Sequence, residues 1–141
     1  MKHSLKCTLG FILIAILSAC GGGSNTNDEI NNLAGTYDYT VFKLTANTCN
    51  TDVAQTIDRG TETVTQEGAN ISINSFGTIF RGTVDEDNKG FTASFTDTKN
   101  GEPVVSKYAF RRIIIAKDYS VSYTITTGGC AVQYSGTALR S

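Results

Sequence analysis

Tyr119-Ser120-Val121-Ser122-Tyr123-Thr124-Ile125-Thr126, followed by Gly128-Gly129 and a second alternating run from Cys130, decides the fold class. Bulky apolar residues occupy every second position of the first run, and small polar residues stand between them. Successive side chains point to opposite faces in a β-strand, so this run is a strand with one buried face. Val132 and Tyr134 repeat the pattern after the two glycines, which suit a tight turn. The two runs together predict an antiparallel hairpin.

The same period of two extends backward through the chain to about residue 35. Its residues are mainly Thr, Val, Ile, Tyr and Phe, interrupted by Gly, Asn and Asp. We expect eight strands, at Thr36–Leu44, Glu62–Glu67, Asn70–Ser75, Thr78–Val84, Gly90–Thr96, Val104–Ile115, Tyr119–Thr127 and Cys130–Leu139. Most links between them are short and force antiparallel neighbours, so the predicted fold is an all-β, up-and-down meander. The exception is Thr45–Thr61, a long loop in which we expect a helical turn around Asp52–Ile57.

The beginning of the chain has the features of an export signal. Lys2 and Lys6 precede an apolar run that ends at Leu17, and this run is only about half as long as a membrane-spanning helix. The motif Leu17-Ser18-Ala19-Cys20 resembles the lipobox of bacterial lipoproteins. That resemblance implies cleavage before Cys20 and attachment of lipid to its sulfur and its new amino group.

The lipoprotein resemblance also predicts the organisation and location of the mature chain. Residues 1–19 are then a signal peptide, 20–34 are the lipidated cysteine and a flexible polar tether, and 35–141 form a single β domain. Several acyl chains anchor a protein firmly, so the expected partner of Cys20 is the membrane of the bacterial cell envelope. Gly21 indicates the outer membrane, because Asp at that position is the retention signal for the inner membrane in many such proteins.

The remaining cysteines predict a disulfide. Cys7 leaves with the signal peptide and Cys20 carries lipid, so Cys49 and Cys130 are the only pair left in the mature domain. Disulfides persist outside the cytoplasm, and we expect these two residues to be bonded.

The position of this disulfide distinguishes two architectures. Cys49 lies just beyond the first expected strand and Cys130 begins the last, and these points meet if the two strands pair antiparallel. A meander whose first and last strands pair is a closed barrel, with an interior that side chains can fill or that can hold one small ligand. The alternative is a two-sheet β-sandwich, in which the same bond would join one sheet to the other. We favour the barrel.

One further motif agrees with a barrel. Leu33-Ala34-Gly35-Thr36-Tyr37 resembles the Gly-x-Trp opening of lipocalins, with Tyr37 in the place of the tryptophan, and a long loop after the first strand is also a lipocalin feature. The resemblance implies a lipocalin-like barrel. Small β-barrel lipoproteins that inhibit lysozyme are also similar in type, but their Ser-Gly-x-x-Tyr loop is missing here; Tyr134-Ser135-Gly136-Thr137 reads as strand alternation.

Composition argues against most catalytic machinery. Without residues 1–19 the twelve basic residues fall to ten against thirteen acidic ones, a net charge of about −3, which offers no basic face for nucleic acid. His3 is the only histidine, so the mature domain has no histidine nucleophile pair, general base or zinc ligand. We therefore expect a protein that is not an enzyme and that needs neither cofactor nor metal.

Two sets of acidic residues are candidate functional sites. Glu62, Glu67 and Asp38 are candidates for carboxylate catalysis, but we interpret each as a solvated strand residue. The run Asp85–Gly90 begins like a calcium-binding loop, yet its fifth position is Lys89 and its twelfth is not a glutamate. We expect a polar hairpin turn there.

These observations leave three hypotheses on function. The first is a lipid-anchored envelope protein that binds a small apolar molecule or an envelope protein without catalysis. The second is a structural or surface-interaction lipoprotein, such as a hydrolase inhibitor, that uses the Thr45–Thr61 loop and the acidic hairpin as contact surfaces. The third, an enzyme based on carboxylates, is the least supported. Because several bulky residues point inward, among them Tyr123, Tyr134, Phe91 and Phe95, we expect a filled interior more than a hollow one.

Overall fold

The computed structural model describes residues 31–113 and 118–141, and every regular element in these ranges is a β-strand. The strands are β1 Gly35–Tyr39, β2 Phe42–Asn47, β3 Thr56–Ile57, β4 Thr61–Glu67, β5 Asn70–Ser75, β6 Thr78–Val84, β7 Gly90–Lys99, β8 Glu102–Arg112, β9 Asp118–Thr127 and β10 Cys130–Arg140. The described residues contain no helix that is long and apolar enough to cross a membrane. The predicted all-β class is confirmed.

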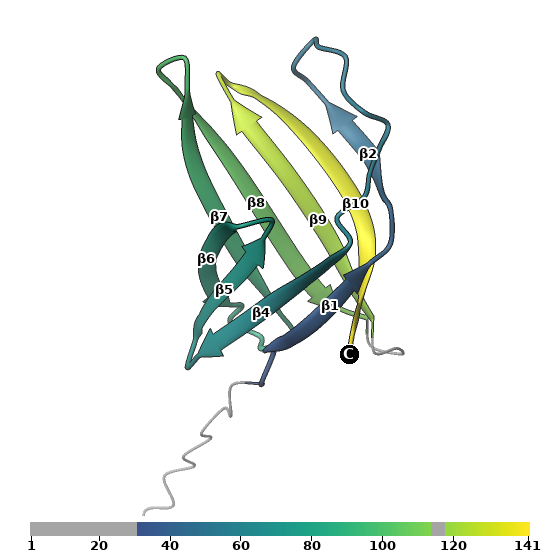
Figure 1. Cartoon of the computed structure of the whole chain (residues 1–141), viewed down its shortest axis with the longest axis vertical. Helices are drawn as coiled ribbons and strands as arrows, with labels where there is room; N and C mark the ends of the chain where they lie inside the picture. The colour runs from purple at the N-terminus through teal and green to yellow at the C-terminus, as the bar shows by residue number, and fades with distance from the viewer. Residues whose placement is uncertain (1–30, 114–117) are drawn as a thin grey trace, which may run out of the picture.

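The strands form one antiparallel meander that closes on itself (Figure 1). From β4 to β10 each strand pairs with the next along the chain, and β10 then pairs with β1, as in the partnership of Tyr37 with Arg140. Because the first and last strands pair, the sheet is a closed barrel. The alternative two-sheet sandwich is wrong.

The ten short elements amount to eight barrel strands. β1 and β2 follow one another along β10, separated by Thr40 and Val41, and together they replace the single strand expected at Thr36–Leu44. β3 and β4 likewise act as one strand, because Asp38 lies opposite Thr61 and Phe42 lies opposite Ile57 in the same register. The helical turn expected around Asp52–Ile57 is wrong, since Thr56 and Ile57 are in β3 and the residues before them are not helical.

Aromatic side chains fill the interior at the end of the barrel where β7 and β9 begin and β8 ends. Tyr37 is fully buried, and its ring meets the rings of Phe91, Phe110 and Tyr119 edge-on, with centroids 5.4 to 6.2 Å apart. Phe91 and Phe110 stack on each other at 4.2 Å. The interior at this end is packed. Toward the other end, Tyr123 and Tyr134 on the two C-terminal strands are also buried, as the alternation of these strands predicted.

A glycine makes room for one of the core rings. A Cβ atom at Gly136 on β10 would lie 2.1 Å from Cδ1 of Phe42, far inside any real contact. Phe42, fully buried on β2, therefore lies directly against the bare backbone of β10. The close approach explains why the alternating pattern of β10 has a glycine at an inward position.

The chain enters the barrel at its packed end. Leu33 is only 3% exposed, its backbone N–H donates to Oε1 of Gln66, and its carbonyl accepts from the Tyr37 hydroxyl. Arg140 donates to the carbonyl oxygens of Asn32 and Ala34. Contacts with the barrel thus begin before residue 35, the residue at which the β domain was expected to start. Cys20 and the expected signal peptide at residues 1–19 lie outside the described residues.

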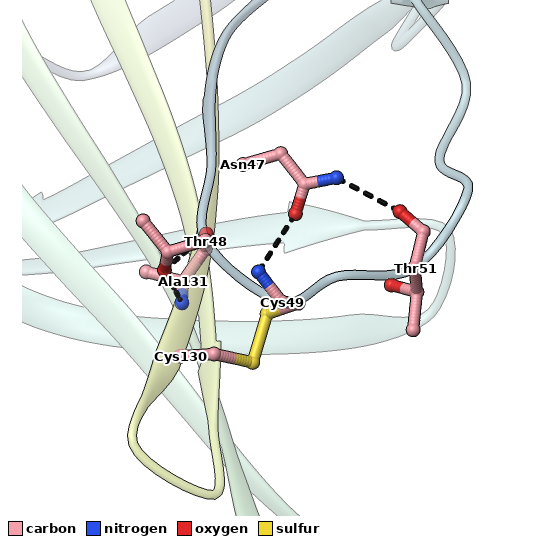
Figure 2. The surroundings of a disulfide bond; sticks show 6 residues. All are labelled: Asn47, Thr48, Cys49, Thr51, Cys130 and Ala131. Atoms are coloured by element: carbon pink, nitrogen blue, oxygen red, sulfur yellow. Dashed lines mark hydrogen bonds between the residues drawn. A yellow bond between two sulfur atoms is a disulfide. The ribbon is translucent and has the colours of Figure 1, made fainter.

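The predicted disulfide is present and joins the first and last barrel strands (Figure 2). The Cα atoms of Cys49 and Cys130 are 4.9 Å apart across 81 positions of sequence. Beside it, the Thr48 hydroxyl accepts from the backbone N–H of Ala131 at 2.8 Å. Asn47 accepts from the N–H of Cys49 at 2.9 Å and donates to the carbonyl of Thr51 at 2.8 Å. These contacts hold the loop after β2 against the start of β10.

Candidate functional site

The barrel wall is uneven, and its open end contains the most unusual group of side chains. The β7–β8 and β9–β10 hairpins and β2 extend well above the turn between β5 and β6 (Figure 1). Below the rim, Arg59 reaches inward from the bend between β3 and β4. That bend is a short polar turn, because the Asp58 carboxylate accepts from the N–H of Gly60 at 2.9 Å and Gly60 has a φ of 61°.

The Arg59 guanidinium lies among aromatic rings. Its central carbon is 4.9 Å from the centroid of the Tyr123 ring, 5.2 Å from that of Phe76 and 5.5 Å from that of Tyr108. Such contacts attract a cation to the negative face of a ring, and the attraction grows when water is excluded. Only 18% of the Arg59 side chain is exposed. The group is thus a positive charge held in an aromatic setting just beneath the mouth.

Glu62 neutralises this charge from below. Its side chain is only 1% exposed, and one carboxylate oxygen accepts from Arg59 at 3.2 Å and from the Tyr108 hydroxyl at 2.9 Å. Ser75 also donates to that oxygen, and the Tyr39 hydroxyl donates to the other at 2.9 Å. The expectation that Glu62 is a solvated strand residue is wrong. Its position two residues before Val64, on the same face of the strand, was the signal that could have identified it.

The protonation of this cluster follows from its burial. Burial, followed by the neighbouring Glu62 carboxylate, raises the pKa of both Tyr39 and Tyr108 above their ordinary value of 10.0. Burial opposes the charge on Arg59, but Tyr108 and Glu62 outweigh it and raise the pKa of the guanidinium. The two hydroxyls therefore remain donors, and the arginine remains charged. Because every partner of Glu62 is a donor, this network orients Arg59 and satisfies the buried carboxylate.

A pocket of about 210 Å³ opens above the network. It is lined by Arg59, Ser75, Phe76, Thr78, Phe80, Phe95, Asp97, Lys99, Val104, Ser106 and Tyr123. Glu62 is not part of the lining. Arg59 uses Nε and Nη2 for its hydrogen bonds, and no buried side-chain nitrogen or oxygen in the described ranges lacks a partner. Its Nη1 group is thus open to solvent and free to donate.

Phe76 lies at one edge of this pocket in an unfavourable backbone conformation. It occupies the turn between β5 and β6, is 77% exposed and has a φ of 48°, which an aromatic residue rarely adopts. Neither hydrophobic burial nor backbone preference explains a phenylalanine there, since asparagine or glycine suits such a turn better. The expected strands Asn70–Ser75 and Thr78–Val84 leave Phe76-Gly77 as the short link between them, but the sequence gave no sign that the ring would lie beside a largely buried arginine.

The two contact surfaces expected from the sequence lie at opposite ends of the barrel. The Thr45–Thr61 loop contributes Arg59 and is held at the mouth, where the Tyr134 hydroxyl donates to the carbonyl of Ala54 at 3.0 Å. The acidic hairpin lies near the packed end, because Asn31 donates to the carbonyl of Asn88 at 2.7 Å. Only the first surface therefore belongs to the site at the mouth.

The acidic hairpin is a polar turn, as predicted. Its Asp87 carboxylate accepts from Arg111 at 2.7 Å and from the backbone N–H of Lys89 at 3.2 Å, and the backbone contact comes first among the causes that lower the pKa of Asp87. Asp85 also approaches Arg111, at 3.4 Å. Within residues 31–113 and 118–141 no cluster of three potential metal ligands occurs.

The other predicted acidic candidates lie apart from the mouth site. Asp38 is on the outside of β1, where it accepts from the Thr61 hydroxyl at 2.7 Å, and Glu67 is exposed at the end of β4. Neither carboxylate is a partner of Glu62.

Comparisons with known proteins add nothing to this picture. The chain matches no protein family, no curated protein and no solved structure. A small β-barrel is compatible with a binding role, and any more specific function has to be argued from the side chains at the mouth.

Proposed function

We propose that this protein is a lipid-anchored component of the bacterial cell envelope that binds another protein, without catalysis, at the open end of its barrel. The observation that carries the proposal is Phe76, a strained and exposed aromatic residue that contacts the buried Arg59 at the edge of a pocket. Aromatic and arginine residues dominate the energetics of protein interfaces. An exposed apolar side chain in a strained backbone conformation is unfavourable in the free protein. Binding of a partner protein would explain why phenylalanine occupies this position.

The packed interior favours a protein partner over an apolar cargo. A carrier needs empty volume inside the barrel, whereas the half below Arg59 is filled by rings such as Tyr37, Phe91 and Phe110. The pocket above it has about 210 Å³, which is smaller than the usual site for a small-molecule ligand, about 300 to 1,000 Å³. Carriage of a lipid is therefore the weaker proposal.

The anchoring part of the proposal is supported by sequence and by the direction of the chain. Leu17-Ser18-Ala19-Cys20 is the motif that implies lipid on Cys20. Leu33 and its neighbours join the barrel at the end opposite the mouth (Figure 1). A tether that leaves from that end would point the mouth away from the membrane. An outer-membrane location is the version of this proposal that Gly21 favours.

The absence of catalysis is part of the proposal and is supported by the state of the acids. The buried carboxylate of Glu62 is held by Tyr39, Ser75, Tyr108 and Arg59 and does not line the pocket. A general acid or base has to reach the substrate directly or through one water molecule. Glu62 is better placed to orient Arg59 than to act on a substrate.

Site-specific photo-crosslinking in intact cells tests this proposal. A photoreactive amino acid is placed at position 76, and a matched control carries it at Ala69, an exposed position in the turn between β4 and β5 at the other end. We expect a defined crosslinked protein from position 76 and none from position 69, with the product identified by mass spectrometry. Equal products from both positions, or none from position 76, would overturn the proposal.

A further inference from the structure

One strand at the mouth has a free side. β6 pairs with β7 only as far as Arg81 opposite Ser94, whereas β7 continues to Lys99 and remains paired with β8 throughout. The segment Phe95–Lys99 thus has a neighbouring strand on one side only within the described residues. In Figure 1 this segment rises above the turn between β5 and β6.

The backbone groups on this free side can be identified. Neighbouring residues of an antiparallel strand direct their N–H and C=O groups to opposite sides in turn. Pro103, which has no N–H, lies opposite Thr98, and the N–H of Thr98 donates instead to the Asp97 carboxylate at 2.7 Å. Thr98 and Thr96 therefore face away from β8. Outside the strand ladders, no backbone–backbone hydrogen bond among the described residues involves either residue.

The pocket lies directly beside this edge. Phe95, Asp97 and Lys99 of β7 all line it. An extended chain that paired with β7 would therefore run along the rim of the pocket. Since alternate side chains of a strand point to the same face, one or two side chains of the added strand would turn toward the pocket.

The lining indicates which side chain fits. Its apolar walls are rings, those of Phe76, Phe80, Phe95 and Tyr123, with the centroids of Phe80 and Phe95 5.9 Å apart. Hydroxyls and the free Nη1 of Arg59 supply polar partners within the same lining. A volume of about 210 Å³ suits one large side chain. An aromatic ring with a polar tip, as in tyrosine, matches both parts of the pocket.

We propose that an extended segment of a partner protein adds as a β-strand to the free edge of β7 at Phe95–Lys99 and inserts an aromatic side chain into the pocket above Arg59. In this mode of recognition the main-chain hydrogen bonds supply affinity and the side-chain pocket supplies specificity. The inference rests on the proposed function, because it names how the partner binds at the mouth.

A second copy of this chain is a less suitable occupant. In a symmetric antiparallel pairing centred on Asp97, which would use Thr96 and Thr98 of both copies, the two Asp97 carboxylates would lie directly opposite each other. Like charges at opposed positions destabilise a pair of strands. A segment from a different protein has no such constraint.

The test uses defined peptides and the mature lipidated protein in detergent micelles. The first probe is a blocked peptide of alternating threonine and tyrosine, and the second replaces every tyrosine with alanine. We expect the tyrosine peptide to bind at least five times more tightly. Protection from amide hydrogen exchange should increase at Thr96 when it binds. Equal affinities, or protection elsewhere with none at Thr96, would overturn the proposal.

A substitution on the protein separates strand addition from a simple surface contact. Thr96→Pro removes the outward N–H without removing a hydrogen bond to β8, and proline is tolerated at such an edge. Thr96→Ala keeps the backbone N–H and removes the hydroxyl and the γ-methyl group. We expect the proline variant to bind the tyrosine peptide at least ten times more weakly than the alanine variant, with both still folded by circular dichroism. Equal binding by the two variants would overturn the proposal, as would dimerisation of the protein that Thr96→Pro abolishes.

Failure of this inference can be told from failure of the proposed function. If the crosslinked partner at position 76 persists in Thr96→Pro, the mouth binds a protein but not by strand addition. If no crosslink forms at position 76 in the unsubstituted chain, the proposed function itself fails.

Discussion

The two ends of the barrel interior are built from different side chains and have different properties. At the packed end, Tyr37, Phe91 and Phe110 exclude water and contact one another as rings. At the mouth, Arg59 and Glu62 form an ion pair beneath an open pocket. Aromatic packing stabilises without selecting a partner, whereas a satisfied polar network fixes the direction of one cation. The difference indicates that aromatic packing stabilises one end, and it is at the other end that we propose recognition of a partner.

The largest expected loss of stability follows removal of the disulfide at the mouth. Replacing both Cys49 and Cys130 by serine releases a loop of 81 positions. In the chain-entropy account this lowers the free energy of unfolding by about 4 to 5 kcal/mol. Denaturant unfolding of the variant and of the reduced unsubstituted protein should agree. A loss below about 1 kcal/mol would show that the mouth loop contributes little to the fold.

The next effect tests the packed end. Phe91→Ala should lower the free energy of unfolding by about 3 to 5 kcal/mol, because a fully buried ring is replaced by a cavity. Leu139→Ala is the control, since Leu139 is 49% exposed and its loss should cost far less. Chemical denaturation measures both. If the two variants lost similar stability, the packed end would not be the stabilising part of the barrel.

The free energy of unfolding at alkaline pH tests the burial of tyrosine hydroxyls at both ends of the barrel. Burial is the first cause that raises the pKa of Tyr37, Tyr39 and Tyr108 above the ordinary value of 10.0. A raised pKa in the folded state means that stability is complete below pH 10 and is lost as the pH rises above it, because the unfolded chain ionises first. Each such group contributes a loss of about 1.4 kcal/mol per pH unit above 10. Unfolding curves at increasing pH measure it, and a flat profile above pH 10 would contradict it.

A smaller effect is expected in the polar network at the mouth. Glu62→Gln keeps the shape of the side chain but removes the charge that balances Arg59, and it should cost about 2 kcal/mol. Glu67→Gln, at an exposed position, should cost less than about 0.5 kcal/mol. Thermal unfolding of the two variants gives the comparison. Equal losses would mean that the buried ion pair does not matter to the fold.

The smallest effect on stability is expected at Phe76, with a large effect on binding. Asparagine accepts a φ of 48° more readily than phenylalanine, so Phe76→Asn should leave stability unchanged or raise it by up to about 1 kcal/mol. The crosslink formed by a photoreactive residue at Lys99 should nevertheless weaken at least fivefold. If the variant lost stability and kept the crosslink, Phe76 would contribute to the fold and not to binding. That result would contradict the binding role proposed for the mouth.

The strands and the closure of the barrel could be predicted from sequence far better than the site at the mouth. Alternation at Tyr119, Val121 and Tyr123 depends only on which face is buried, and the position of Cys49 relative to Cys130 was enough to predict barrel closure. The break between β1 and β2 was missed, because strand propensity is continuous through Thr40 and Val41. The bend that carries Arg59 lies opposite this break, and its position depends on pairing between distant segments.

Glu62 shows the limit of reasoning from single residues. A glutamate in a strand is usually solvated, and its burial depends on donors from Tyr39, Ser75, Tyr108 and Arg59, which come from four separate parts of the chain. No local pattern contains them all. The pocket was unpredictable for the same reason, since its lining combines residues of five strands and two turns or bends.

Native mass spectrometry of the purified, full-length protein tests most directly whether binding takes place at the mouth and not inside the barrel. The packed rings of Tyr37, Phe91 and Phe110 fill the barrel interior at the end where the chain enters. We therefore expect a single species with the mass of the lipidated chain after release from detergent. A species that retains an additional apolar molecule, and that loses it only on unfolding, would contradict the account.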